Sequence, residues 1–223
     1  MDNSRGETRE KIVTREARAE TGPHANARLE AFCDGVFAIA LTLLIIDVKI
    51  HSPESITSVA DFWAALRHLG PIGFAFLLSF AIILISWVNH HAIMKLVNHS
   101  SATFIYANGF LLLTIVTIPF SASLLGEFLW TDFAAPAVVI YNAVLTLLAV
   151  GWILMTGVAL KSRFTIDAEA TLAMSKANRN GYFAVALYGL LSITALWFPL
   201  AVAIITTVTW IFWLALGIRM KHA

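Results

Sequence analysis

The chain has 223 residues, of which 59% are hydrophobic and only 13% are charged, and its mean hydropathy is +0.78. Soluble domains carry about 25% charged residues, so this composition argues against a water-exposed globule. The net charge of +1 gives no indication of nucleic-acid binding, and a single cysteine, Cys33, excludes an intrachain disulfide.

Residues 1–27 alternate acidic and basic side chains and are predicted to form a solvated cytoplasmic tail. They lack the apolar core of a cleavable signal, so the first hydrophobic segment is expected to target the chain itself. Six apolar stretches follow, each approaching the roughly 20 residues that cross a bilayer. The stretches are 31–50, 70–89, 105–125, 134–160, 182–198 and 200–218. The prediction is an all-α, polytopic membrane protein with its transmembrane domain at 28–219 and a short cytoplasmic end at 220–223.

Two further features concern the connections between these stretches. Residues 57–68 are amphipathic and are expected to lie along the outer membrane interface before the second span. Pro199 separates the last two stretches and favours a tight hairpin between them.

Lysine and arginine are distributed unequally between the two sides of the predicted membrane. If the N-terminus is inside, thirteen of the fifteen basic residues are cytoplasmic and only Lys49 and Arg67 are outside. The positive-inside rule therefore places both termini, and the connections at 91–104 and 161–181, in the cytoplasm. The expected location is the cell membrane.

The first stretch carries two ionisable residues, Asp34 and Asp47. A central Asp costs about 2.5–3.5 kcal/mol on insertion scales, so both are functional candidates. At about 100° per residue, Asp34 points away from an aliphatic stripe, Asp47 flanks it, and Thr42 lies beside it, able to bond its own backbone. By spacing alone, the stripe favours lipid contact or bundle packing. The stripe consists of Phe32, Gly35, Ile39, Leu43, Ile46 and Ile50.

The start of this stretch, Arg28-Leu-Glu-Ala-Phe32-Cys33-Asp34, resembles the R-x-x-x-F-S-D box of the endolysosomal potassium channel family. The six-span layout and the Trp-x-x-His-His ending of the second span agree, although only the box is specific. Cys33 stands where the family usually has Ser, and a thiol is a poor hydrogen-bond donor. This departure puts the polar contact of that position in question.

The resemblance implies a potassium-permeable cation channel with a modest preference for K⁺ over Na⁺. First helices from four identical subunits would line the pore, and the matching constriction residues would be Ile39, Leu43 and Ile46. These three residues also fall on the stripe that spacing defines. The sequence has no T-V-G-Y-G segment, so selectivity is expected to come from rings of side chains. A ring of Asp47 carboxylates would attract cations at the outer mouth. The expected partners are further copies of the chain, K⁺ and the lipid bilayer, with no cofactor.

A polar cluster is expected at the cytoplasmic end of the first three spans. Its preferred role is structural, clamping the first helix onto the second and third, and proton sensing by its histidines is second. His90 and His91 diverge by about 100° on a helix, which argues against a shared metal ion. The expected members are Arg28, Asp34, Trp87, Asn89, His90, His91 and Asn108.

Two other functions compete with a channel. A secondary transporter or proton-coupled carrier for small cations would predict inverted repeats and matching helix breaks, which the sequence does not show. An intramembrane enzyme would need a nucleophile and a base within hydrogen-bond reach. Cys33 and Asp34 are the candidates, but neighbouring side chains on a helix diverge, so the chain is not expected to be an enzyme.

Overall fold

A computed structural model describes residues 26–49, 54 and 56–219, and the side chains of Asp47 and of 212–219 fall outside this description. The predicted tail lies outside the described residues apart from Asn26 and Ala27, as do Ile50 and the end at 220–223. The described chain is all-α, as predicted, and its one β-type pairing is an isolated bridge between Val97 and Thr165.

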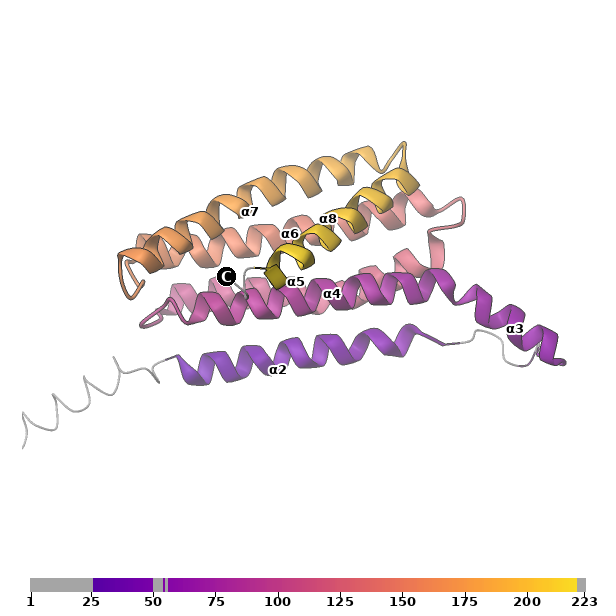
Figure 1. Cartoon of the computed structure of the whole chain (residues 1–223), viewed down its shortest axis with the longest axis horizontal. Helices are drawn as coiled ribbons and strands as arrows, with labels where there is room; N and C mark the ends of the chain where they lie inside the picture. Colours follow the sequence, from indigo (N-terminus) through magenta and orange to yellow (C-terminus); the bar gives the residue numbers. More distant parts are fainter. Residues whose placement is uncertain (1–25, 50–53, 55, 220–223) are drawn as a thin grey trace, which may run out of the picture.

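The long helices lie side by side along the longest axis of the molecule, with α2 on one side of the bundle and α7 on the other (Figure 1). Helix α6 packs against α5, α7 and α8, whereas α2 packs against α4 and α5. The elements are α2 (Ala27–Leu43), the 3-10 turn η1 (Leu44–Asp47), α3 (Val59–His68), α4 (Gly70–Met94), α5 (Ala102–Phe128), α6 (Ala134–Lys161), α7 (Ala168–Thr194) and α8 (Pro199–Arg219).

Four segments of the described chain are long and apolar enough to cross a membrane. They are Ala27–Ile46, Gly70–Met94, Ala102–Phe128 and Ala134–Lys161, and they match the first four predicted spans. Helices α7 and α8 correspond to the last two. Pro199 starts α8, where its fixed φ and missing N–H are tolerated, so the predicted hairpin after α7 is confirmed.

The prediction that residues 161–181 form a loop was wrong for most of that range. Helix α7 begins at Ala168 rather than near residue 182, because the Asp167 carboxylate accepts a hydrogen bond from the Ala170 backbone N–H at 2.7 Å and caps the first turn. The charged residues Lys176 and Arg179 therefore lie on a helix and not in a loop. Apolar patterning alone could not detect this polar extension.

The amphipathic segment before the second span forms helix α3. The Ser58 hydroxyl caps it by accepting from the Asp61 backbone N–H at 3.1 Å, and the Thr57 hydroxyl donates to the Asp61 carboxylate at 3.0 Å. Hydrogen bonding to Ser58 and Thr57 holds the pKa of Asp61 below its ordinary value. Helix α3 lies at one end of the bundle, beyond the start of α4 (Figure 1). Its location at the membrane interface stays a prediction.

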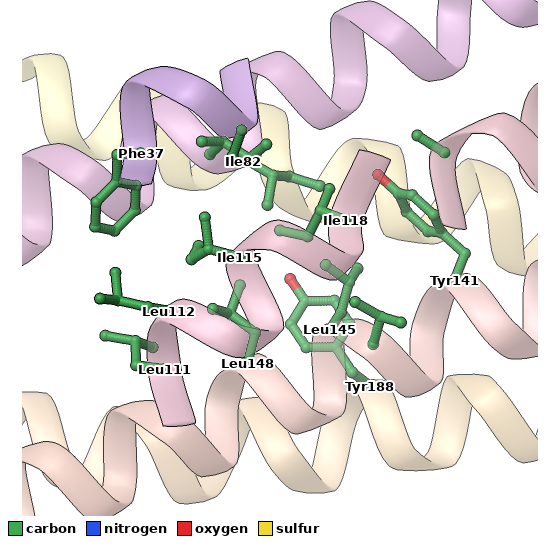
Figure 2. Close-up of a cluster of buried hydrophobic side chains, with 14 of the residues drawn as sticks. Phe37, Ile82, Leu111, Leu112, Ile115, Ile118, Tyr141, Leu145, Leu148 and Tyr188 are labelled. Atoms are coloured by element: carbon green, nitrogen blue, oxygen red, sulfur yellow. The ribbon is translucent and has the colours of Figure 1, made fainter. Parts of the chain in front are cut away.

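Large side chains from five helices meet in one buried cluster (Figure 2). Between lipid-embedded helices, such a cluster stabilises the fold through close packing rather than through removal from water. It includes Phe37 of α2, Ile82 of α4, Ile115 of α5, Leu148 of α6 and Tyr188 of α7.

Two connections pair at the end of the bundle opposite the α7–α8 turn. The backbone N–H of Asn98 donates to the carbonyl of Phe164 at 2.9 Å, and that of Ile166 donates to Leu96 at 3.1 Å. The ring centroids of His99 and Phe164 lie 4.3 Å apart. The connections after α4 and after α6 therefore lie at the same end, which agrees with their predicted placement on one side of the membrane.

Candidate functional site

Helix α2 has one face covered by its own subunit and one face left open. The covered face consists of Cys33, Phe37, Ala40 and Leu44, each 3% exposed or less. The predicted aliphatic stripe occupies the open face: Ile39 is 58% exposed, Leu43 40% and Ile46 61%. Phe32 and Gly35 are exposed on the same face. Within the described subunit, the stripe therefore lacks a packing partner.

The end of α2 tightens, which the sequence analysis did not anticipate. Residues Leu44–Asp47 form a 3-10 turn, with about 3.0 residues per turn instead of 3.6, yet Ile46 stays exposed. Thr42 is exposed beside the stripe, and its hydroxyl donates to the Ile39 carbonyl at 2.8 Å, the backbone bond that the sequence suggested. The Asp47 side chain lies outside the described part of the chain.

Asp34 receives one of the partners expected for it. The indole Nε1–H of Trp87 on α4 donates to the Asp34 carboxylate at 2.8 Å, and both side chains are partly buried. An indole N–H is a donor only, so it satisfies the carboxylate without adding a second charge. This bond links α2, the helix that is predicted to line the pore, to its neighbour α4.

A second contact joins the same two helices at the same end. Nδ1 of His91 lies 2.7 Å from Oε1 of Glu30, and the His91 ring stacks on Trp87 with centroids 6.2 Å apart. The side chains of His91 and Glu30 are 41% and 29% exposed, but the contacting atom Nδ1 of His91 is itself buried. Glu30 and Asp34 are four residues apart and face α4 together.

A buried group of three residues ties α2 to both α4 and α5. The Asn108 amide nitrogen donates to the Cys33 sulfur at 2.9 Å, and its oxygen lies 2.9 Å from Nε2 of His90. With an oxygen opposite it, Nε2 of His90 carries the hydrogen, so the ring can be neutral. The three side chains are 1% exposed or less. The thiol thus acts as an acceptor, the role that a serine oxygen would also fill.

Not all of the expected cluster assembles. Arg28 and Asn89 are exposed, and neither forms a hydrogen bond or ion pair with the described members of the cluster. On α4, Asn89 faces outward because it lies about 100° from His90, which points inward. His90 and His91 bind different partners, and the described residues contain no group of three metal-type ligands.

Sequence reasoning missed two members of this site. Glu30 was part of the family box but received no role, although its spacing from Asp34 places both on one face. Phe37 packs against His90 with ring centroids 5.4 Å apart and closes the buried side of the cluster. The three-to-four-residue spacing of Glu30, Asp34 and Phe37 was the available signal.

The hydrogen bonds of the cluster join α2 to α4 and to α5. The Cys33 thiol is bonded to Asn108 and the Asp34 carboxylate to Trp87, so they do not form a nucleophile–base pair with each other. Removing one partner of a buried hydrogen bond costs about 1–3 kcal/mol. The cluster can therefore hold the covered face of α2 in place while the open face stays free.

Known proteins resemble this chain in sequence and in fold. The family model for the endosomal/lysosomal potassium channel TMEM175 matches residues 28–119, which include the box, α4 and most of α5. The crystal structure of a homologue of the lysosomal potassium-selective channel TMEM175 from Chamaesiphon minutus superposes with a TM-score of 0.73. The two sequences are 31% identical, and the match covers 85% of this chain and 96% of the homologue. The chain belongs to the TMEM175 family.

Two curated potassium channels are also similar in sequence to this TMEM175 family chain. A potassium channel of Chamaesiphon minutus is 40% identical over 139 residues, 62% of this chain and 66% of that protein. A potassium channel of Streptomyces collinus is 34% identical over 128 residues, 57% of this chain and 61% of that protein. The match thus spans slightly less than two thirds of either relative. Both are named as channels, in agreement with the predicted protein class rather than with an enzyme.

Proposed function

We propose that this chain is one subunit of a potassium-permeable cation channel, and that α2 of each subunit lines the pore. The observation that carries the proposal is the open aliphatic face of α2, with Ile39, Leu43 and Ile46 between 40% and 61% exposed. The opposite face is fixed to α4 and α5 by hydrogen bonds. Both curated relatives named above are potassium channels, which supports the same function.

One chain supplies one α2, so a closed pore requires several copies around a symmetry axis. We propose a homotetramer in the cell membrane with both termini in the cytoplasm. The thirteen-to-two distribution of basic residues supports this orientation. The pairing of the two connections that follow α4 and α6 supports it as well, since both carry residues of the cytoplasmic set.

Three aliphatic rings would then form the constriction. Such rings offer no ligand to a dehydrated ion, and a narrow apolar ring can block conduction by dewetting. A modest preference for K⁺ over Na⁺ is expected, because no carbonyl filter replaces the hydration shell. Asp47 would concentrate cations near the outer mouth, an effect that high salt weakens.

The test compares two isoleucines of the same segment. Ile39 lies on the stripe, whereas Ile45 is 54% exposed and lies roughly 120° away around the helix. We expect Ile39→Asn to raise unitary conductance and to weaken K⁺/Na⁺ preference, and Ile45→Asn to leave both near wild type. Leu44 is a poor control, because it is 3% exposed and its change to Asn disturbs packing.

The measurement is current through planar bilayers under bi-ionic K⁺/Na⁺ conditions, with assembly checked by size-exclusion chromatography. Discrete unitary currents distinguish a channel from a carrier. The pore assignment fails if correctly assembled Ile39→Asn protein keeps wild-type conductance and reversal potential, or if Ile45→Asn changes permeation more.

A further inference from the structure

A groove opens at the end of the bundle where α4 and α8 begin and α5 ends. Its volume is about 520 Å³, within the range of roughly 300–1,000 Å³ that is typical of ligand sites. None of its residues belongs to the polar cluster or to the stripe on α2. Under the proposed topology, this is the outer end of the molecule.

The groove has a buried floor and an exposed rim. The floor includes Leu129, 4% exposed, and Ala203, 8% exposed. The rim includes Trp130, 68% exposed, and Ile204, 65% exposed. The side chains of the subunit therefore leave a trough that is open to the surroundings but floored by residues that the bulk solvent or bulk lipid scarcely touches.

The side chains that line the groove offer almost no polar group to an occupant. Among the described lining residues, Thr207 carries the one hydroxyl, and this hydroxyl already donates to the Ala203 carbonyl of its own helix at 2.8 Å. The only other polar side-chain atom of these residues is the indole nitrogen of Trp130. An apolar occupant fits this chemistry, because it leaves no polar group unpaired.

The length of the groove along α8 is close to the thickness of one leaflet of a bilayer. Along α8, the lining runs from Leu200 to Val208, nine residues that rise by about 12 Å at 1.5 Å per residue. Half of a hydrocarbon core is roughly 15 Å. Trp130 lies just beyond the end of α5, where an indole commonly sits at the level of the lipid headgroups.

The groove also continues into exposed apolar surface, since Val208 lines it and Leu77 lies about one helical turn from the lining residue Phe74. Leu77 of α4 and Val208 of α8 are 66% and 60% exposed, in a chain that belongs to a family of membrane channels. Bilayer lipid covers such surfaces. From this continuity, the length of the groove along α8 and the apolar lining, we propose that the groove binds one acyl chain of an outer-leaflet phospholipid as a resident lipid. A second copy of the chain is the competing occupant.

The experiment uses the full chain purified in detergent after reconstitution with dioleoyl phosphatidylglycerol or dioleoyl phosphatidylcholine. Native mass spectrometry counts the lipids that stay bound to each subunit. A groove-filling variant, Ala203→Leu with Thr207→Leu, is compared with Ala201→Leu and Thr209→Leu on the same helix. The Thr209 hydroxyl also bonds its own backbone, at 2.8 Å from Ile205, so the two pairs lose equivalent hydrogen bonds.

We expect wild type and the control variant to retain one lipid per subunit, and the groove-filling variant to retain several-fold less. Retention of both lipids would identify the acyl chain as the recognised part, and retention of only one would add a headgroup preference. The proposal is overturned if wild type retains no lipid or if both variants retain it equally. Loss of oligomer in the groove-filling variant, with no lipid in wild type, would instead assign the groove to a second copy. If the double variant fails to fold, Thr207→Leu alone gives the same comparison.

Discussion

Asn108 determines how the buried part of the cluster holds together. Its amide nitrogen donates to the Cys33 sulfur on α2, and its amide oxygen accepts from Nε2 of His90 on α4. None of the three side chains is more than 1% exposed. A buried polar group that loses its partner costs about 1–3 kcal/mol, because water cannot replace the bond. A change at any of these residues therefore acts on two helices at once.

The first prediction concerns the thiol. We expect Cys33→Ser to keep wild-type thermal stability, because the serine oxygen can accept the same hydrogen bond from Asn108. We expect Cys33→Ala to lose roughly 1–3 kcal/mol, since the amide N–H is left unpaired. Thermal unfolding of the purified protein, followed by circular dichroism, checks both. If the serine variant is as unstable as the alanine variant, the packing of sulfur matters more than its hydrogen bond.

The second prediction concerns Asp34. Asp34→Ala removes the acceptor of the Trp87 indole and should reduce the fraction of assembled oligomer, whereas Asp34→Asn keeps an oxygen in place and should assemble. Light scattering coupled to size-exclusion chromatography gives the two fractions. An Asp34→Ala protein that assembles normally but has altered ion selectivity would place this residue in the pore.

The sequence identified the cluster better than it identified its contacts. Asp34 had to have a polar partner because a bare carboxylate is costly in a membrane. From the sequence alone, Arg28, Trp87, Asn89 and either histidine were equally reachable. Only the packing of α2 against α4 selects Trp87 and turns Asn89 outward. Glu30 received no role because a carboxylate at a helix start needs no partner in water, and its pairing with His91 depends on tertiary structure.

At the scale of the helices, close approach depends on glycine where two backbones meet. A Cβ at Gly126 of α5 would lie 2.8 Å from the Cα of Ile72 on α4, closer than real Cβ contacts. At Gly109 of the same helix, a Cβ would meet nothing within 4 Å. The two glycines therefore differ in whether the neighbouring helix tolerates a methyl group.

This difference gives the third prediction. Gly126→Ala should destabilise the protein by about 1–3 kcal/mol, because α4 and α5 must separate. Gly109→Ala should be neutral or stabilise by up to about 1 kcal/mol, because alanine is the better helix former. Thermal unfolding of the two variants under identical conditions measures both effects. Equal destabilisation would mean that the α4–α5 contact is more adaptable than the structure indicates.

Helix existence was predictable, and helix ends were not. Apolar length found the first four spans, because a membrane requires about 20 apolar residues whatever the neighbours are. The start of α7 depends on Asp167 as a cap and on polar residues beyond the hydrocarbon, where hydropathy carries no signal. The 3-10 turn at Leu44–Asp47 has no signature in its aliphatic sequence either.

At the scale of the whole molecule, the topology is the fourth prediction. In a Cys33→Ser background, a cysteine at Asp132 should react with a membrane-impermeant maleimide in intact cells. A cysteine at Lys176 should react only after permeabilisation, since the basic residues of α7 belong to the cytoplasmic side. Both positions are exposed in the subunit, so access is not limited by packing. Labelling of both in intact cells would contradict the orientation.

The contacts of α2 can form only late during synthesis, because its partners lie far along the chain. Asp34 precedes Trp87 by 53 residues, and Cys33 precedes Asn108 by 75 residues. At about 5–20 residues per second, the ribosome needs roughly 3–11 s to supply Trp87 and roughly 4–15 s to supply Asn108. During that interval the nascent helix carries an unpaired carboxylate, which offsets part of the favourable transfer of its apolar side chains into the membrane. The arrival of α4 then pairs the carboxylate with Trp87 and adds to the stability that the hydrophobicity of α2 already gives the first helix in the bilayer.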